Sequence, residues 1–361
     1  TSASVIVNNR LQQTSVICCS AIFLLLQYVN KVSFGHSLLL NRGMSSKRSF
    51  LDASKKSFIE SKSDDDEDVK SSRKRMAKSP NDTPALALAT YNIWFGSTGY
   101  ENQRMEAIID ALRPHAPNLI GFQEVTASLA SIIFPLLESL GYHTIVQPFS
   151  SYGCAIACKV DQIIDSGYHP FSNSKMDRGI VWALIRHNNR ELLFTTTHLE
   201  SYLDASDNGG PEREVQLVEI AEFCERCIRE RSTVDLAIIT GDLNWDDERA
   251  RSVGDNRKLI SLLDETKWFD AYRYVNPKET GYTYDPKVNP MLGGGSVRRR
   301  FDRILIHSHD LQKVNVSKID IVGKDALPGL KYVVPPTRFH GPKTRLVAPS
   351  DHFGLVSSIT F

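Results

Sequence analysis

Apolar residues from position 85 onward are grouped in short runs, and each run ends at a cluster of polar residues. The runs have the length and content of buried strands and lie at residues 85–93, 119–122, 192–197, 234–240 and 353–361. Between them, apolar residues recur at helical spacing from Met105 to Leu112 and from Leu129 to Leu140, where Pro135 is expected to kink or restart the helix. Strands that alternate with amphipathic helices predict an α/β fold of stacked sheets flanked by helices.

The polar clusters beside these strands hold the residue types of a phosphate-cleaving site. They are Thr90-Tyr91-Asn92, Gln123-Glu124, His198-Leu199-Glu200-Ser201, Gly241-Asp242-Leu243-Asn244 and Ser350-Asp351-His352. Carboxylates, amides and imidazoles at separate strand ends converge only after folding, so the pattern predicts a single site.

Phosphodiester hydrolysis accounts for these residue types. The reaction needs a cation on the phosphoryl oxygens and a positioned water, and hard cations such as Mg²⁺ prefer carboxylate oxygens. Glu124 is therefore the candidate metal ligand, and Asp242 with Asn244 the candidate pair that orients or deprotonates water. His352 would donate to a phosphoryl oxygen, and Asp302 is the carboxylate expected to keep it protonated.

Each of these residues also has a purely structural interpretation. Gly-Asp-x-Asn is an ordinary turn sequence, since Asp and Asn bond their own backbone. Glu124 alone reads as a strand-end surface charge, and His198 and His352 alone read as hydrogen-bonded core histidines. The order of the clusters and their places after strands favour a site over these alternatives.

Composition limits the classes of function. The chain has 361 residues, 41% hydrophobic content and a formal net charge of +1, so it can form a large core but has no generally basic surface. Any contact with nucleic acid must therefore be local. The six cysteines suggest no disulfide framework, and Cys224 and Cys227 lie in a helical pattern that favours buried thiols over zinc.

The first 84 residues differ from the rest. Residues 1–43 lack Asp and Glu and are rich in Ser, which is the bias of an organelle transit peptide, although Met44 is an equally good natural start with translated leader before it. The apolar run from Val16 to Val29 is too short for a membrane span of roughly 20 residues. Residues 44–84 are expected to be a disordered charged linker, whose cluster Arg73-Lys74-Arg75 reads as a solvated charge run or a nuclear import signal.

The clusters resemble the signatures of the endonuclease/exonuclease/phosphatase superfamily over residues 85–361. The resemblance implies a four-layer α/β/β/α sandwich with its metal site at one edge of the sheets. Within the superfamily, the chain resembles the tyrosyl-DNA phosphodiesterase 2 family, and its plant members most. The resemblance lies at residues 198–201, 241–247, 281–292, 300–304 and 322–330. This implies a magnesium-dependent hydrolase, with manganese as the alternative, that removes a topoisomerase II tyrosine from a DNA 5′ phosphate during DNA repair.

Roles can be carried over by position. Asn92, Glu124, Asp242 and His352 match the family's catalytic core, with Glu124 as metal ligand and Asp242 as the residue that activates water. The resemblance further implies that Asn244 orients water and phosphate and that Asp302 orients His352. His198 and Ser201 match the motif that holds the scissile phosphate.

A groove for a DNA 5′ end needs cations and stacking surfaces. Arg300, with neighbouring arginines, and the rings of Tyr282 and Tyr284 offer both, although the arginines have surface acids as alternative partners. Arg178 is a candidate for a cation–π contact with the substrate tyrosine.

Other interpretations stay open. The same metal core serves abasic-site endonucleases, inositol phosphatases and deadenylases, and a catalytically inactive DNA-binding scaffold is an alternative of another class. The expected partners are DNA with 5′-phosphotyrosyl ends and topoisomerase II–DNA adducts, with no membrane association and a monomer as the default. The expected compartment is the nucleus, or a plastid or mitochondrion if residues 1–43 are a transit peptide.

Overall fold

The computed structural model describes residues 85–148, 151–201, 209–245, 259–336 and 341–361. The expected leader at 1–43 and the expected linker at 44–84 lie outside the described residues.

Two six-stranded mixed sheets form the centre of the fold. The first has the order β11-β14-β1-β2-β4-β3 and the second β5-β6-β7-β8-β10-β9. Strands of the first sheet are β1 (Leu86–Asn92), β2 (Leu119–Val125), β3 (His143–Val146), β4 (Gly153–Cys158), β11 (Asn315–Val322) and β14 (Gly354–Thr360). Strands of the second are β5 (Gln162–Pro170), β6 (Gly179–His187), β7 (Arg190–His198), β8 (Val234–Asp242), β9 (Trp268–Asp270) and β10 (Asp302–Ser308). The pairs β1–β2 and β7–β8 are parallel, so the polar ends of paired strands meet at the same edge.

The remaining elements are helices and one small hairpin. The α-helices are α2 (Glu101–Leu112), α3 (Ala127–Ser139), α4 (Gly210–Glu230) and α5 (Ala271–Val275), and the 3₁₀ turns are η1 (Arg113–His115), η2 (Leu259–Leu262), η3 (Pro290–Leu292) and η4 (Leu311–Lys313). Strands β12 (Lys331–Val334) and β13 (Lys343–Leu346) form a separate two-stranded sheet. None of the helices in the described residues is long and apolar enough to cross a membrane.

Helix α3 continues through Pro135, so of the two expected effects of this proline, a kink or a restart, the restart does not occur. The Thr126 hydroxyl caps its first turn by accepting from the Leu129 N–H at 3.2 Å. Pro135 lies on the exposed side of the helix. The carbonyl that loses its partner there can be hydrated, so the break costs less than it would in the core.

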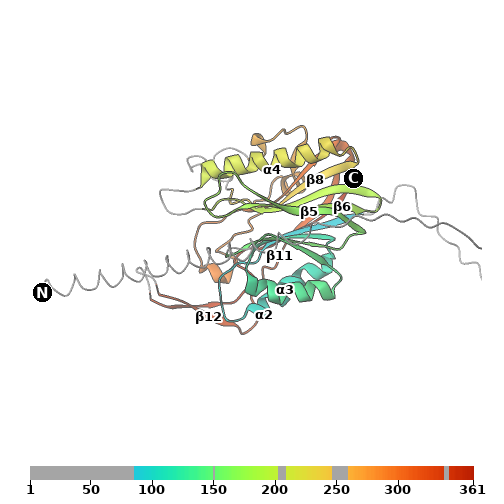
Figure 1. Cartoon of the computed structure of the whole chain (residues 1–361). Coiled ribbons are helices and arrows are strands. Elements are labelled where there is room, and N and C mark those ends of the chain that lie inside the picture. The colour runs from blue at the N-terminus through green and yellow to red at the C-terminus, as the bar shows by residue number, and fades with distance from the viewer. Residues whose placement is uncertain (1–84, 149–150, 202–208, 246–258, 337–340) are drawn as a thin grey trace, which may run out of the picture. The chain divides into compact units, whose positions relative to one another are not determined.

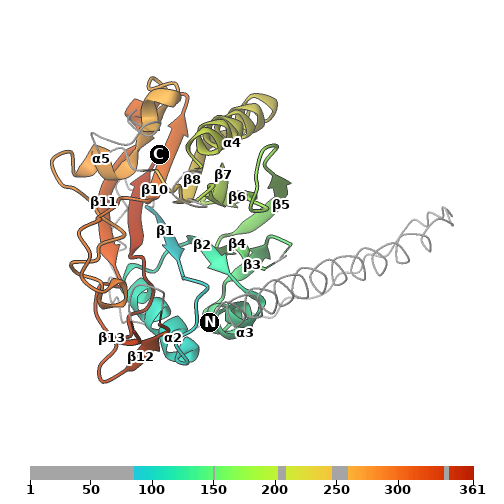
Figure 2. The ribbon, with the colours of Figure 1, turned by 90° about the vertical axis from the view of Figure 1, so that its left-hand side faces the viewer.

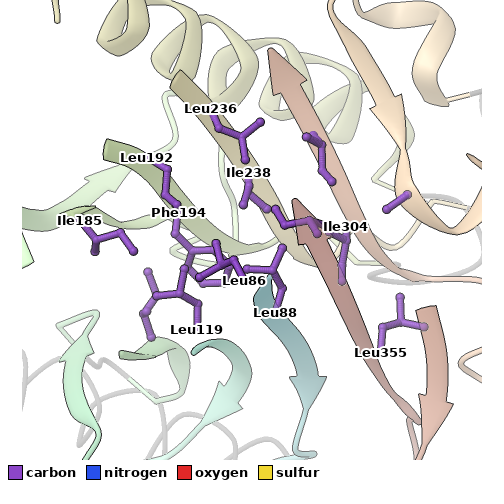
Figure 3. Packing of buried hydrophobic residues seen from close by; sticks show 14 of the residues in the cluster. Leu86, Leu88, Leu119, Ile185, Leu192, Phe194, Leu236, Ile238, Ile304 and Leu355 are labelled. Atoms are coloured by element: carbon purple, nitrogen blue, oxygen red, sulfur yellow. The ribbon is translucent and has the colours of Figure 1, made fainter. Parts of the chain in front are cut away.

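Buried apolar side chains form three layers, which confirms the predicted four-layer α/β/β/α sandwich (Figure 1). The middle layer lies between the two sheets, where Leu88 and Leu119 of the first face Phe194 and Ile238 of the second (Figure 3). A second layer packs α2 and α3 on the first sheet, and a third packs α4 on the second. Cys224 is buried in the layer under α4, as expected for a reduced core thiol.

The layer between the sheets becomes polar toward one end. Gln123 donates to the hydroxyls of Thr196 at 2.8 Å and Thr90 at 3.1 Å, which links the two sheets. Gly121 makes this close approach possible. A Cβ at Gly121 would lie 2.4 Å from Thr196 Oγ1 and 2.5 Å from Thr240 Oγ1.

The substitution Gly121→Ala should therefore force the sheets apart at this point. We expect a loss of about 1–3 kcal/mol in the free energy of unfolding, measured by urea denaturation. The control is Gly295→Ala, because the nearest heavy atom to its added Cβ lies at an ordinary 3.5 Å. Equal stability of the two variants would contradict this account.

His307 gives a pH-dependent prediction for stability. It is 1% exposed, its two ring nitrogens have no hydrogen-bond partner, and its ring packs edge-on against Trp268 at 4.9 Å. Burial lowers its pKa to about 4. Because the unfolded chain takes up this proton near pH 6.5, folding stability is intact above that pH and falls between 6.5 and 4, by about 3 kcal/mol at most.

The substitution His307→Phe should remove that contribution and flatten the pH dependence of the unfolding free energy over this window. The exposed His143 provides the control, as His143→Phe should leave the wild-type slope in place. A wild-type slope in the His307 variant would show that other groups dominate.

Candidate active site

Strands β1, β2, β7 and β8 end with polar residues at one end of the sandwich, and Figure 2 shows these strands from that end. In the second sheet, the strand register places His198 at the end of β7 beside Asp242 at the end of β8, and Asp242 opposite Asp302 at the start of β10. In the first sheet, β1 ends at Asn92 and β2 carries Glu124 as its penultimate residue. The structure thus brings together residues that are far apart in sequence.

Asn92 connects the two sheets. Its side-chain Nδ2 donates to Glu124 Oε1 and to Asp242 Oδ2, each at 3.0 Å, and the side chain is fully buried. One amide therefore holds two carboxylates in fixed positions. Asn92 Oδ1 accepts from the Trp94 N–H at 3.0 Å, which fixes which end of the amide faces the carboxylates.

Glu124 reaches the site because the backbone of β2 departs from regular strand geometry there. Its φ is 61°, and the register of β2 against β4 shifts between Phe122 and Val125. Its second oxygen accepts from the Phe95 N–H at 3.0 Å. Burial raises the pKa of Glu124, while the Asn92 hydrogen bond and His352 act in the opposite direction.

Asp242 is buried at the centre of the cluster. Its Oδ2 lies 3.4 Å from His198 Nε2 and 3.7 Å from His352 Nε2. Burial raises its pKa to about 6, with His352 lowering and Asp302 raising it. The group is therefore ionised at neutral pH yet basic enough to take a proton.

Asn244 forms the turn expected of the Gly-Asp-x-Asn sequence and lies beside Asp242. Its N–H donates to Asp242 Oδ1 at 2.9 Å, which is the turn that Asp side chains commonly make. Its backbone is left-handed, with a φ of 49°, and its Nδ2 donates to the Leu199 carbonyl at 3.0 Å. The turn therefore places the amide inside the cluster.

His352 forms an ion pair with Asp302. Nδ1 of the imidazole lies 2.8 Å from Asp302 Oδ2, and Tyr284 packs edge-on against the ring at 5.3 Å. Burial alone would lower the pKa of His352, but Asp302 and Asp242 outweigh it and raise that pKa well above its ordinary value. The imidazole is therefore protonated, with Nε2–H directed toward the cluster.

His198 has the opposite protonation state. Its Nδ1 lies 2.7 Å from Arg178 Nη1, and a guanidinium can only donate, so Nδ1 accepts and the proton is on Nε2. Burial, Arg178 and His352 together lower the pKa of His198 well below its ordinary value. The site thus holds one neutral and one charged imidazole around the same carboxylate.

Two aromatic residues that the sequence did not single out complete this side of the site. The Tyr152 ring lies under the Arg178 guanidinium, with its centroid 4.9 Å from Cζ, and the Tyr152 hydroxyl accepts a hydrogen bond from Arg178 Nη2 at 2.9 Å. Phe95 stacks on Tyr152 at 4.8 Å with an interplanar angle of 7° and is 50% exposed. The only sequence signal was their proximity to strand ends, because ring stacking depends on tertiary geometry.

Arg104 was also missed, although its position carries a signal. It is a charged residue four positions before Ile108 on the apolar stripe of α2, and it is fully buried. Its guanidinium donates to the carbonyls of Ile93 at 2.6 Å, Trp94 at 3.0 Å and Gly96 at 2.9 Å, and its Nε to Pro349 at 3.1 Å. It therefore ties the loop after β1 to the segment that leads into His352.

Three further expected substrate-binding residues contact other side chains of the protein. Arg300 is 2% exposed and pairs with Asp270 at 2.6 Å, so its charge has a buried partner. Tyr282 lies under Arg298 at 4.4 Å. Ser201 Oγ lies 3.2 Å from Met176 Sδ, beside the cluster.

The donor set fits a divalent cation. Two groups of potential ligands lie within reach of one ion: Glu124 with His198 and Asp242, and Asp242 with Asp302 and His352. Both imidazoles carry a proton on Nε2, which leaves carboxylates as ligands. Burial raises the pKa of both Glu124 and Asp242 because it penalises their ionised forms, and a bound hard cation would stabilise those forms.

Comparisons with known proteins agree with this fold. Residues 89–352 match the model of the Endonuclease/Exonuclease/phosphatase family. Tyrosyl-DNA phosphodiesterase 2 of Rattus norvegicus is 26% identical over 291 residues, which cover 78% of this chain and 70% of that protein. Two crystal structures share the fold with a TM-score of 0.60 and cover 77% of this chain. They are truncated Caenorhabditis elegans TDP2, at 21% identity and 98% of its length, and D. rerio TDP2 complexed with single strand DNA product, at 19% and 99%.

The ion pair between His352 and Asp302 can be tested without substrate. Because the folded pKa of His352 exceeds the unfolded value, its stabilising charge is fully present below about pH 6.5 and is lost as pH rises through the folded pKa. We expect both ring nitrogens to remain protonated at pH 7 by ¹⁵N NMR of histidine-labelled, metal-free protein. Asp302→Asn should lower this pKa toward the ordinary value.

The matched control is Asp320→Asn, which removes a carboxylate 3.8 Å from His115. It should leave the titration of His352 unchanged. Titration of His352 at the same pH in wild type and Asp302→Asn would refute the ion pair.

Proposed function

The chain belongs to the Endonuclease/Exonuclease/phosphatase family, and from this premise we propose that it is a magnesium-dependent 5′-tyrosyl-DNA phosphodiesterase of DNA repair. The family match and the assembled site identify the chain as a phosphodiesterase hydrolase, as its sequence predicted. The proposed substrate is the phosphodiester between a topoisomerase II tyrosine and a DNA 5′ phosphate. The name of the rat relative and the DNA product bound to the D. rerio protein support this choice.

One observation carries the proposal: a carboxylate that can accept a proton and an imidazolium that can donate a hydrogen bond face the same space. Asp242, with a pKa of about 6, is placed to orient water and take its proton. His352, protonated and held by Asp302, would stabilise negative charge on a phosphoryl oxygen. His198 Nε2–H adds a neutral donor 3.4 Å from Asp242 Oδ2.

We propose Glu124 as the ligand that holds the cation, with Mg²⁺ as the expected ion and Mn²⁺ as the alternative. When bound, such an ion polarises phosphoryl oxygens and offsets their charge. Asn92 keeps Glu124 and Asp242 apart at fixed positions, so one carboxylate remains for the ion and the other for water.

The aromatic and cationic side of the site favours a phosphate ester with an aromatic leaving group. Arg178, stacked on Tyr152, supplies a buried positive charge next to His198. The exposed ring of Phe95 extends this surface outward, where a phenolic ring could pack. An ester with an aliphatic leaving group would gain less from this surface.

The test is release of tyrosine from a 5′-phosphotyrosyl oligonucleotide by the full chain, with and without Mg²⁺ and chelator. Substitution of Asp242 by Asn should reduce the turnover number by about 10²–10⁴, because the base is removed while the shape is kept. The control, Asp110→Asn, removes a carboxylate whose side chain is 70% exposed on α2 and should retain activity.

An abasic-site duplex serves as the competing substrate. Preference for that duplex, or no release of tyrosine by a folded wild-type protein, would eliminate the tyrosyl-DNA assignment and leave the hydrolase assignment. Full activity of the Asp242 variant would eliminate the proposed base.

A further inference from the structure

The β12–β13 hairpin belongs to neither large sheet and lies at the rim of the site. Its base is closed by two backbone hydrogen bonds, from Leu327 N–H to the Val347 carbonyl at 2.7 Å and from Val347 N–H to the Leu330 carbonyl at 3.1 Å. An isolated two-stranded hairpin is at best marginally stable in water. Contacts on one of its faces must therefore hold it in place.

The strand register defines that inner face as Tyr332, Val334, Lys343 and Arg345, because Tyr332 pairs with Arg345 and Val334 with Lys343. The Tyr332 hydroxyl donates to the Met291 carbonyl at 3.4 Å, and Arg345 donates to the same carbonyl. The Tyr332 ring also contacts Trp94 edge-on at 6.4 Å.

This face is close to the reacting groups. Trp94 donates its N–H to Asn92 Oδ1 at 3.0 Å, and Asn92 holds both catalytic carboxylates. Burial is the largest cause of the raised pKa of Tyr332. Arg345 lowers that pKa and Asp351, the residue next to His352, raises it, so Tyr332 lies near both charges. The inner face therefore adjoins the site through Trp94.

The opposite, outer face carries Lys331, Val333, Thr344 and Leu346. Val333 is 62% exposed and Leu346 40% exposed. A positive charge is thus present on each face, but only the inner one combines it with aromatic rings at the site.

The segment that contains the hairpin carries positive charge only. Residues 326–350 contain four Lys and Arg and no Asp or Glu, although the whole chain has a formal net charge of only +1. Lys343 is exposed and forms no ion pair within the ranges that the structure describes. Its charge is available to a partner.

We propose that the inner face of the hairpin, together with Trp94, binds the single strand of nucleic acid that leads away from the scissile phosphate. Strand phosphates pair with cations, and unstacked bases pack on aromatic rings, so Lys343 and Arg345 beside Tyr332 and Trp94 supply both kinds of contact. The identity of the strand rests on the proposed function, because a 5′ end in the site must continue across the rim.

The two lysines of the hairpin provide a matched test. The full chain and its variants Lys343→Glu and Lys331→Glu are titrated with a 5′-phosphorylated, fluorescein-labelled single-stranded oligonucleotide, without added metal, at several salt concentrations. Lys343→Glu should weaken binding by about tenfold at low salt and lower the slope of log affinity against log salt by about 0.7 or more. Lys331→Glu makes the same change of charge on the outer face and should leave both quantities within about twofold of wild type.

Hydrolysis of two esters separates this inference from the proposed function. With a 5′-phosphotyrosyl oligonucleotide, Lys343→Glu should raise KM and leave kcat unchanged. With a mononucleotide p-nitrophenyl ester, which has no strand to reach the hairpin, both variants should match wild type. A wild type that hydrolyses neither ester would refute the proposed function, while the binding comparison would still decide the role of the hairpin.

Equal weakening by both substitutions would mean a general charge effect and would overturn the proposal. So would unchanged binding in Lys343→Glu. Competition by a poly-glutamate peptide as effective as that by unlabelled oligonucleotide would show a surface for any polyanion and would also overturn it.

Discussion

Close contact between the two sheets at one end of the sandwich is the constraint on which the site depends. Asn92 and Asp242 belong to different sheets, and their 3.0 Å hydrogen bond forms only where the sheets nearly touch. Gly121 and the threonines opposite it allow that approach. Large apolar side chains separate the sheets elsewhere (Figure 3). The apolar part of this layer therefore holds the sheets together, and its polar part forms the candidate site.

This approach concentrates charge in a buried space. Two carboxylates have raised pKa values there mainly because burial penalises their ionised forms. Two histidines respond in opposite directions. Burial disfavours the cation of both, but Asp302 and Asp242 outweigh it at His352, whereas Arg178 adds to it at His198. Their different roles follow from their neighbours and not from residue type.

The alternation of apolar runs and the polar strand ends were sufficient to predict the sandwich and to place Asn92, Glu124, Asp242 and His352 at one site. Those signals can be found in the sequence, because they depend on the spacing of apolar residues and on the polar residues that follow each strand. Strands that end at the same edge of a sheet then bring those residues together. The positions of Phe95, Tyr152 and Arg104 were not predictable in this way, since ring stacking and carbonyl binding arise between distant segments. The ion pair of Arg300 was not predictable for a related reason: its charge in sequence does not reveal Asp270, with which it pairs in the interior.

Residues of the site also occupy backbone conformations that side chains disfavour. Glu124, Asn244 and Trp94 all have a φ between 49° and 61°. Each such residue stores a strain of about 1 kcal/mol or more, and glycine would relieve it. At Glu124 and Asn244, however, glycine would delete the functional group itself. Relief of strain at Glu124 and Asn244 is therefore closed to a search for more heat-resistant variants, which must use positions outside the site, such as Ala116 with a φ of 42°.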